Sequence, residues 1–141
     1  MNQAQDNQQL LGLIRAMHAV QSQLEASLEP LGLSLAKLGV LAKLVDAGEP
    51  VSLGTLADRM ACVRSNITQL IDRLEVERLV VRIHDPRDRR TVRAALTEQG
   101  RARHAAGAAA LNEAERRLFE GLDDGQRQRL LELLGGLKPA H

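Results

Sequence analysis

Residues 52–96 of the chain read SLGTLADRMACVRSNITQLIDRLEVERLVVRIHDPRDRRTVRAAL, and this stretch decides the fold. Ser52 is a preferred N-cap and begins a short helix. A break of small residues at 61–62 separates that helix from a second one over residues 64–78. The apolar positions of the second helix recur at helical spacing, at Ile67, Leu70, Ile71 and Leu74. Two helices joined by so short a turn predict a helix-turn-helix.

The pattern after this helix changes from helical to extended. Residues 79–83 and 91–96 are short runs rich in valine, which predict two strands. Pro86 and two aspartates between the runs are typical of a turn, so the two strands form a hairpin. This hairpin is called the wing below, and its loop carries three arginines: Arg87, Arg89 and Arg90.

Long helices are predicted on both sides of this unit. An amphipathic helix occupies residues 10–31, and its apolar face is wider than one neighbouring helix needs. Ser34 begins the next helix and Gly48 ends it. Thr97 begins another helix, which runs to about residue 119. Asp123 with Gln126 forms a capping box before a final leucine-rich helix.

The sequence therefore predicts a mainly α fold with a small β-hairpin wing. Residues 34–97 form a winged helix-turn-helix, and residues 1–33 and 98–141 form a helical dimerisation region in the same intertwined domain. We expect a homodimer, because the terminal helices carry more apolar surface than one chain buries. The wide face of the first helix is alternatively explained as core.

Composition excludes several classes of protein. The 141 residues are 44% hydrophobic and 26% charged, which is ordinary for a soluble globular protein. With one Phe and no Trp or Tyr, the apolar residues are mainly Leu, Ala, Val and Ile, and the Leu and Ala predict a largely helical protein. The polar N-terminus and the absence of a long apolar run predict neither a signal peptide nor a membrane span. Cys62 is the only cysteine and forms no intramolecular disulfide, so we expect a cytoplasmic protein.

Charge is distributed unevenly along the chain. Residues 64–103 contain ten arginines and six acidic residues, a net charge of +4, whereas the remainder of the chain carries −3. A basic middle between acidic flanks is typical of a nucleic-acid-binding face.

The outward positions of the helix over residues 64–78 are almost all able to form hydrogen bonds. Candidate contacts to base edges in a major groove are Arg64, Asn66 and Gln69. Candidate contacts to phosphates are Ser65, Thr68 and Arg73. The alternative is an ordinary solvated helix face, and the neighbouring wing favours DNA. An arginine at the tip of a loop suits a narrow minor groove, although a surface cluster of ion pairs is the alternative.

Four segments of the sequence resemble the MarR family of winged-helix regulators. They are LADRM at 56–60, SNITQLIDRLE at 65–75, DPRDRR at 85–90 and LTEQG at 96–100. The resemblance covers nearly the whole chain, and it implies a triangular dimer joined by the terminal helices. It also implies that Asp88 positions Arg90 and that Arg90 enters the minor groove. A dimer places its two recognition helices about one turn of DNA apart, so we expect the operator to be an inverted repeat.

The sequence departs from the pattern of the family at two places. Gln69 stands where many members carry a basic residue, which leaves base preference at that point open. Residues 77–79 lack the glycine usual after the recognition helix. Either Arg78 adopts a left-handed conformation or the helix ends differently.

The resemblance also implies a repressor that is released by a small-molecule effector. Met17 and His18 are the candidates to line an effector cleft, and the alternatives are a core Met17 and an exposed His18. Cys62 is interpreted as a small buried hydrophobe, with a redox-responsive regulator as the alternative. A dimeric adaptor that binds protein instead of DNA is a second alternative. The sequence contains no motif of an enzyme, a cofactor site or a metal site.

Overall fold

The computed structural model describes the backbone of residues 3–60 and 64–138, and the side chains of residues 7–60 and 66–138. The fold is mainly α with a small antiparallel sheet, as predicted. In chain order the elements are α1 (Gln3–Leu28), the 3-10 helix η1 (Glu29–Leu31), α2 (Leu35–Ala47), β1 (Val51–Ser52), α3 (Leu53–Arg59), α4 (Arg64–Val76), β2 (Val80–His84), β3 (Val92–Leu96), α5 (Glu98–Leu118) and α6 (Asp124–Gly135). No helix in the described part is long and apolar enough to cross a membrane.

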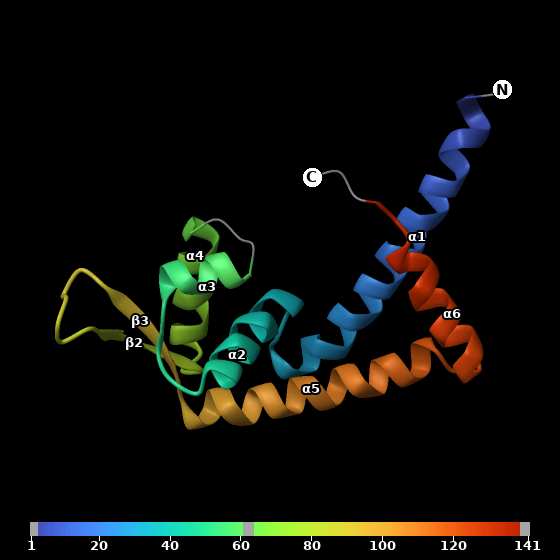
Figure 1. The fold of residues 1–141 in the computed structure, drawn as a ribbon. Helices are drawn as coiled ribbons and strands as arrows, with labels where there is room; N and C mark the ends of the chain where they lie inside the picture. The colour runs from blue at the N-terminus through green and yellow to red at the C-terminus, as the bar shows by residue number, and fades with distance from the viewer. Residues whose placement is uncertain (1–2, 61–63, 139–141) are drawn as a thin grey trace.

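These elements form two groups in space, joined by α5 (Figure 1). Helices α3 and α4 and the hairpin β2–β3 lie at one end, and α1 crosses α6 at the other. Helix α5 packs against both α1 and α2. The segment from α2 to β3 is called the winged lobe below.

The helices begin at the residues predicted to cap them. Ser34, Ser52 and Thr97 each accept a hydrogen bond from the backbone amide three residues on, at 3.1, 3.2 and 2.9 Å. Asp123 Oδ1 accepts from the Gln126 amide at 2.8 Å, and Gln126 Oε1 accepts from the Asp123 amide at 3.0 Å. A cap of this kind stabilises a helix by about 1 kcal/mol, because it satisfies an otherwise unpaired N–H group.

The predicted hairpin is present, with both strands beginning one residue later than expected. Strands β2 and β3 pair antiparallel, from Val80 opposite Leu96 to His84 opposite Val92. A third strand, β1, pairs with the other edge of β3 and was not predicted. Two residues are too few for an alternating pattern, so only the pairing with β3 identifies this strand.

The hydrophobic core lies mainly in the winged lobe. Helix α4 buries Ile67, Ile71 and Leu74 completely, and Leu70 is half-buried. Other fully buried side chains of the lobe are Val40, Leu41, Leu56, Leu79 and Val80. Helix α6, in contrast, buries no residue at all. The winged lobe thus has a core of its own within one chain, whereas α6 does not.

Polar contacts join distant segments both beside the lobe and within it. Arg103 of α5 donates to the carbonyl oxygen of Leu31 at 2.6 Å. Lys37 of α2 forms an ion pair with Glu77, just after α4, at 2.7 Å. These contacts connect segments that lie 72 and 40 residues apart in the sequence.

Helix α4 ends at Val76, two residues earlier than predicted, and Arg78 then adopts a left-handed conformation with φ 62°. Of the two alternatives predicted for the missing glycine, this is the first. The Thr97 hydroxyl contacts the carbonyl oxygens of Arg78 and Leu79, at 2.7 and 3.0 Å. Thr97 therefore holds the corner between α4 and β2.

We expect Arg78→Gly to stabilise the protein by about 1 kcal/mol, because glycine adopts positive φ without the clash of a β-carbon. Arg78→Ala is the matched control, since alanine also lacks the long side chain but keeps the β-carbon. Urea unfolding at a fixed protein concentration measures both variants. A glycine variant no more stable than the alanine variant would contradict strain at this corner.

Candidate nucleic-acid interface

Helix α4 presents a polar outer face. Asn66, Gln69 and Arg73 are exposed, on the side of the helix away from the buried Ile67 and Ile71. Thr68 is half-buried and lies toward β2, so it stands apart from these three. The side chains of two further predicted contacts, Arg64 and Ser65, lie outside the described residues.

Two aspartates shape the loop of the wing. Asp85 Oδ1 accepts from the backbone amide of Arg87 at 2.9 Å, and Asp88 Oδ1 accepts from that of Arg90 at 3.0 Å. Asp88 Oδ2 also accepts from the Thr91 hydroxyl at 3.2 Å. Such contacts between a side chain and the amide two residues on are typical of tight turns. Asp88 thus contacts the backbone of Arg90, and no ion pair joins it to the Arg90 guanidinium in the described part.

The three arginines of the wing loop are all exposed. Within residues 7–60 and 66–138, no carboxylate lies within ion-pair distance of Arg87, Arg89 or Arg90. Asp85 and Asp88 bind backbone amides, and the Asp85 carboxylate also pairs with Arg93 at 3.4 Å. Three cationic groups on one loop are therefore available to an anionic partner.

Arg82 of β2 joins the wing to α4, a role that the sequence does not predict. Its guanidinium contacts the carboxylates of Asp72 and of Glu75, the latter at 2.9 Å. Partial burial lowers the pKa of Arg82, but hydrogen bonds and charge from the two carboxylates outweigh burial and raise the pKa above its usual value. The signal in the sequence is slight, because an arginine in a strand and two acids on a helix are individually ordinary.

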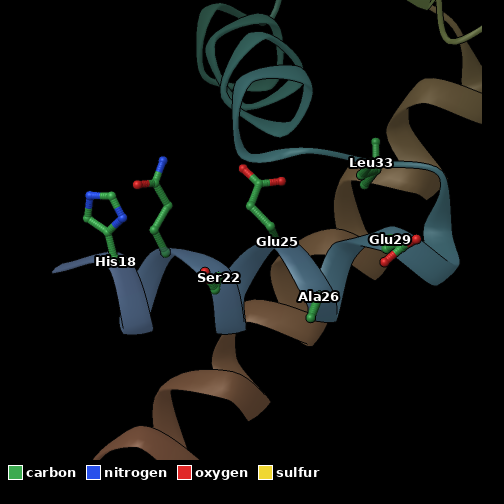
Figure 2. Close-up of a pocket in the computed structure, with 7 residues that line it drawn as sticks. His18, Ser22, Glu25, Ala26, Glu29 and Leu33 are labelled. Carbon is green, nitrogen blue, oxygen red and sulfur yellow. The ribbon is translucent and has the colours of Figure 1, made fainter. Parts of the chain in front are cut away.

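A polar hollow of about 530 Å³ lies beside α1 (Figure 2). His18 and Glu25 leave the same side of the helix, and the Glu25 carboxylate points toward the first turn of α2. Both of its oxygens accept from the amide of Leu35, at 3.2 and 3.4 Å. The hollow is lined by His18, Gln21, Ser22, Glu25, Ala26, Glu29 and Leu33.

Met17 lies in a different hollow from His18. This second hollow is apolar, measures about 790 Å³ and lies between α1, α5 and α6. Phe119 and Leu134 also line it, so Met17 shares this hollow with an aromatic side chain that lies about a hundred residues later in the sequence. The core alternative for Met17 is wrong, because the side chain is 57% exposed. The two candidate effector residues therefore do not meet in one cavity of the single chain.

Cys62 lies outside the described residues, so the structure says nothing of its environment. Among the residues that the structure describes, no group of three His, Cys, Asp or Glu side chains is arranged to hold a metal ion.

The winged lobe is similar in sequence to known proteins. The model of the MarR family matches residues 33–92. The HTH-type transcriptional repressor MdtR of Bacillus subtilis is 34% identical over 90 residues, which cover 64% of this chain and 57% of that protein. The chain spans only about half the length of the curated relatives it matches, 57% and 44%.

Solved structures match nearly the whole chain. A MarR-family transcriptional regulator from Rhodococcus sp. RHA1 is 31% identical with a TM-score of 0.75, over 95% of this chain and 93% of that one. The transcriptional repressor CouR, bound to a 23-mer DNA duplex, is 32% identical with a TM-score of 0.78, over 88% and 87%. CouR from Rhodococcus jostii RHA1 bound to p-coumaroyl-CoA is 28% identical with a TM-score of 0.73, over 99% and 100%.

The contacts of Asp88 are expected to hold the wing loop in one conformation and so to protect it from proteolysis. Asp88→Ala removes the acceptor for two hydrogen bonds, so we expect trypsin to cleave at the wing arginines several-fold faster. Asp88→Asn keeps an acceptor oxygen and is expected to retain the rate of the wild type. Timed digestion followed by mass spectrometry measures both rates. Equal cleavage of all three proteins would show that the side chain does not order the loop.

Proposed function

The chain belongs to the MarR family, and from this premise we propose that it is a transcriptional regulator that binds duplex DNA as a homodimer through its winged helix-turn-helix. The relatives named above are transcriptional regulators, and the proposal assigns no catalytic reaction to this chain. Binding to chromosomal DNA is consistent with a cytoplasmic location.

One observation carries the proposal: the wing offers three arginines that have no carboxylate partner among the described residues, beside a helix whose outer face is polar. A folded protein gains little from cationic side chains held together without counter-charges, whereas a phosphate backbone supplies such charges. CouR, of similar fold and sequence, is known in complex with a DNA duplex, which supports the same partner here.

The proposal divides the site residues by role. Arg64, Asn66 and Gln69 read base edges in the major groove. Ser65, Thr68 and Arg73 hold phosphates, although the half-buried Thr68 is the least accessible of the three. Arg90 enters the minor groove, with Arg87 and Arg89 at the adjacent backbone.

Dimerisation follows from the apolar side chains that one chain leaves exposed. Ten of the thirteen large exposed apolar side chains in the described part lie on α1 or from residue 130 to residue 137. Such a concentration of apolar surface is typical of an interface between protein chains. We assign residues 1–33 and 98–141 to the dimer interface and residues 34–97 to DNA binding, and two-fold symmetry then implies an inverted-repeat operator.

Repression and release by a small molecule are the finer parts of the proposal. MdtR and CouR are both described as repressors, and CouR is known in complex with p-coumaroyl-CoA. Met17 and His18 remain the candidate effector contacts, each in its own hollow beside α1.

The DNA-binding proposal is tested with a duplex selected from a random pool and an unrelated duplex of equal length. We expect Arg90→Ala to weaken binding to both, and to reduce the slope of log affinity against log salt by about one for each subunit. Gln69→Ala is expected to cost about 1–3 kcal/mol on the selected duplex and little on the unrelated one. Competition gel shifts at two salt concentrations measure these effects.

Different outcomes of this experiment test the proposed function and the role assigned to the wing. A wild-type protein that selects no duplex would refute the proposed function. If Arg90→Ala bound as tightly as the wild type at both salt concentrations, the role assigned to the wing would be wrong.

We further expect sedimentation equilibrium to give a dimer at micromolar concentration. The variant Leu131→Glu/Leu134→Glu places charges on the exposed face of α6 and should shift the equilibrium to monomer. Val76→Glu is the matched control, because Val76 is 83% exposed but lies on α4. A folded, soluble wild-type monomer would contradict the proposed interface.

A further inference from the structure

The guanidinium of Arg82 lies across a stripe of α4. Thr68, Asp72 and Glu75 are four and three residues apart, so they share one side of the helix. Arg82 Nη2 contacts the Asp72 carboxylate, and Nη1 donates to Glu75 Oε1 at 2.9 Å. Nη2 also donates to the carbonyl oxygen of Thr68 at 3.5 Å. The Arg82 guanidinium thus forms ion pairs with two carboxylates.

The two carboxylates lie beside the face proposed to meet DNA. Asp72 follows Gln69 by three residues and directly precedes Arg73, and its side chain is 58% exposed. The Glu75 side chain is 40% exposed. Without a nearby cation, two exposed negative charges at this position would repel the phosphate backbone, at distances over which salt screens the repulsion only in part.

The arginine side chain is not needed to hold the strand in place. The backbone amide of Arg82 donates to Glu75 Oε2 at 2.9 Å, and any residue at this position other than proline can make that contact. Strand β2 also pairs with β3 along its whole length, and the adjacent Leu79 and Val80 are fully buried. What the side chain adds is its positive charge, together with the hydrogen bond that Nη2 donates to the carbonyl oxygen of Thr68.

We infer that Arg82 promotes DNA binding by neutralising Asp72 and Glu75, without itself needing to touch the DNA. This inference rests on the proposed function, because it requires α4 and the wing to meet a duplex. It differs from the role of the wing arginines, whose charges have no carboxylate partner among the described residues.

The test compares affinities of five proteins for the selected and unrelated duplexes, by fluorescence anisotropy at about 50 and about 200 mM salt. They are the wild type, Arg82→Gln, the triple variant Asp72→Asn/Glu75→Gln/Arg82→Gln, the double variant Asp72→Asn/Glu75→Gln and the control Arg116→Gln. Arg116 pairs with Glu113 on α5, so its replacement changes the net charge equally, outside the winged lobe.

We expect Arg82→Gln to bind both duplexes about tenfold more weakly at the lower salt, and the loss to shrink at the higher salt as the repulsion is screened. The triple variant should recover to within about twofold of the wild type, because no carboxylate remains uncompensated. The double variant, which frees the Arg82 charge, should bind more tightly than the wild type. The control should change affinity by less than about twofold.

Three results would overturn the inference. The triple variant could bind as weakly as Arg82→Gln, which would show that the side chain positions the wing. The other two are an Arg82→Gln variant that binds DNA as tightly as the wild type, and a control that loses as much affinity as Arg82→Gln. Circular dichroism checks that each variant is folded. If Arg82→Gln does not fold, the double variant decides, and binding no tighter than that of the wild type would refute the inference. A wild type that binds neither duplex would refute the proposed function, and this inference with it.

Discussion

The corner between α4 and β2 is the constraint on which the rest of the lobe depends. The Leu79 carbonyl oxygen accepts from the Thr97 amide at 3.1 Å and from the Thr97 hydroxyl at 3.0 Å. A β-carbon at Gly100 would lie 2.0 Å from the same oxygen, so only glycine allows α5 to begin there. This point therefore sets the direction of three elements together: the end of α4, the start of the wing and the start of α5.

The two parts of the chain that this corner connects differ in how much of their apolar surface they bury within one chain. The winged lobe buries its apolar side chains within one chain and holds its polar ones in local pairs. Helices α1 and α6 leave most of their large apolar side chains exposed, and α6 buries none. Helix α5 packs against α1 and α2 and so connects the two parts. A change in how α1 is held would reach the lobe through this helix and through the contact of Glu25 with Leu35.

Local features were predictable from the sequence, and non-local ones were not. The caps at Ser34, Ser52, Thr97 and Asp123 depend on residues three positions apart, so the pattern of residue types identifies them. Strand β1 escaped prediction because its two residues are defined only by pairing with β3, about forty residues later. The role of Arg82 depends on how β2 crosses α4, and the separation of Met17 from His18 depends on which helix lies against each side of α1. The mainly α winged fold was correct, and the residues proposed to touch DNA stay predictions.

Different residues determine the conformation of the wing loop and its electrostatic potential. Asp85 and Asp88 bind backbone amides and so determine the path of the loop. Arg87, Arg89 and Arg90 contribute charge, and their side chains form no hydrogen bond or ion pair with the other described residues. Substitutions among the arginines can therefore alter attraction to a polyanion without removing a hydrogen bond or ion pair that the described residues make within the loop. In evolutionary terms, affinity and fold stability are separable traits here. Relatives with the same aspartates can diverge widely in binding strength while their wings keep one shape.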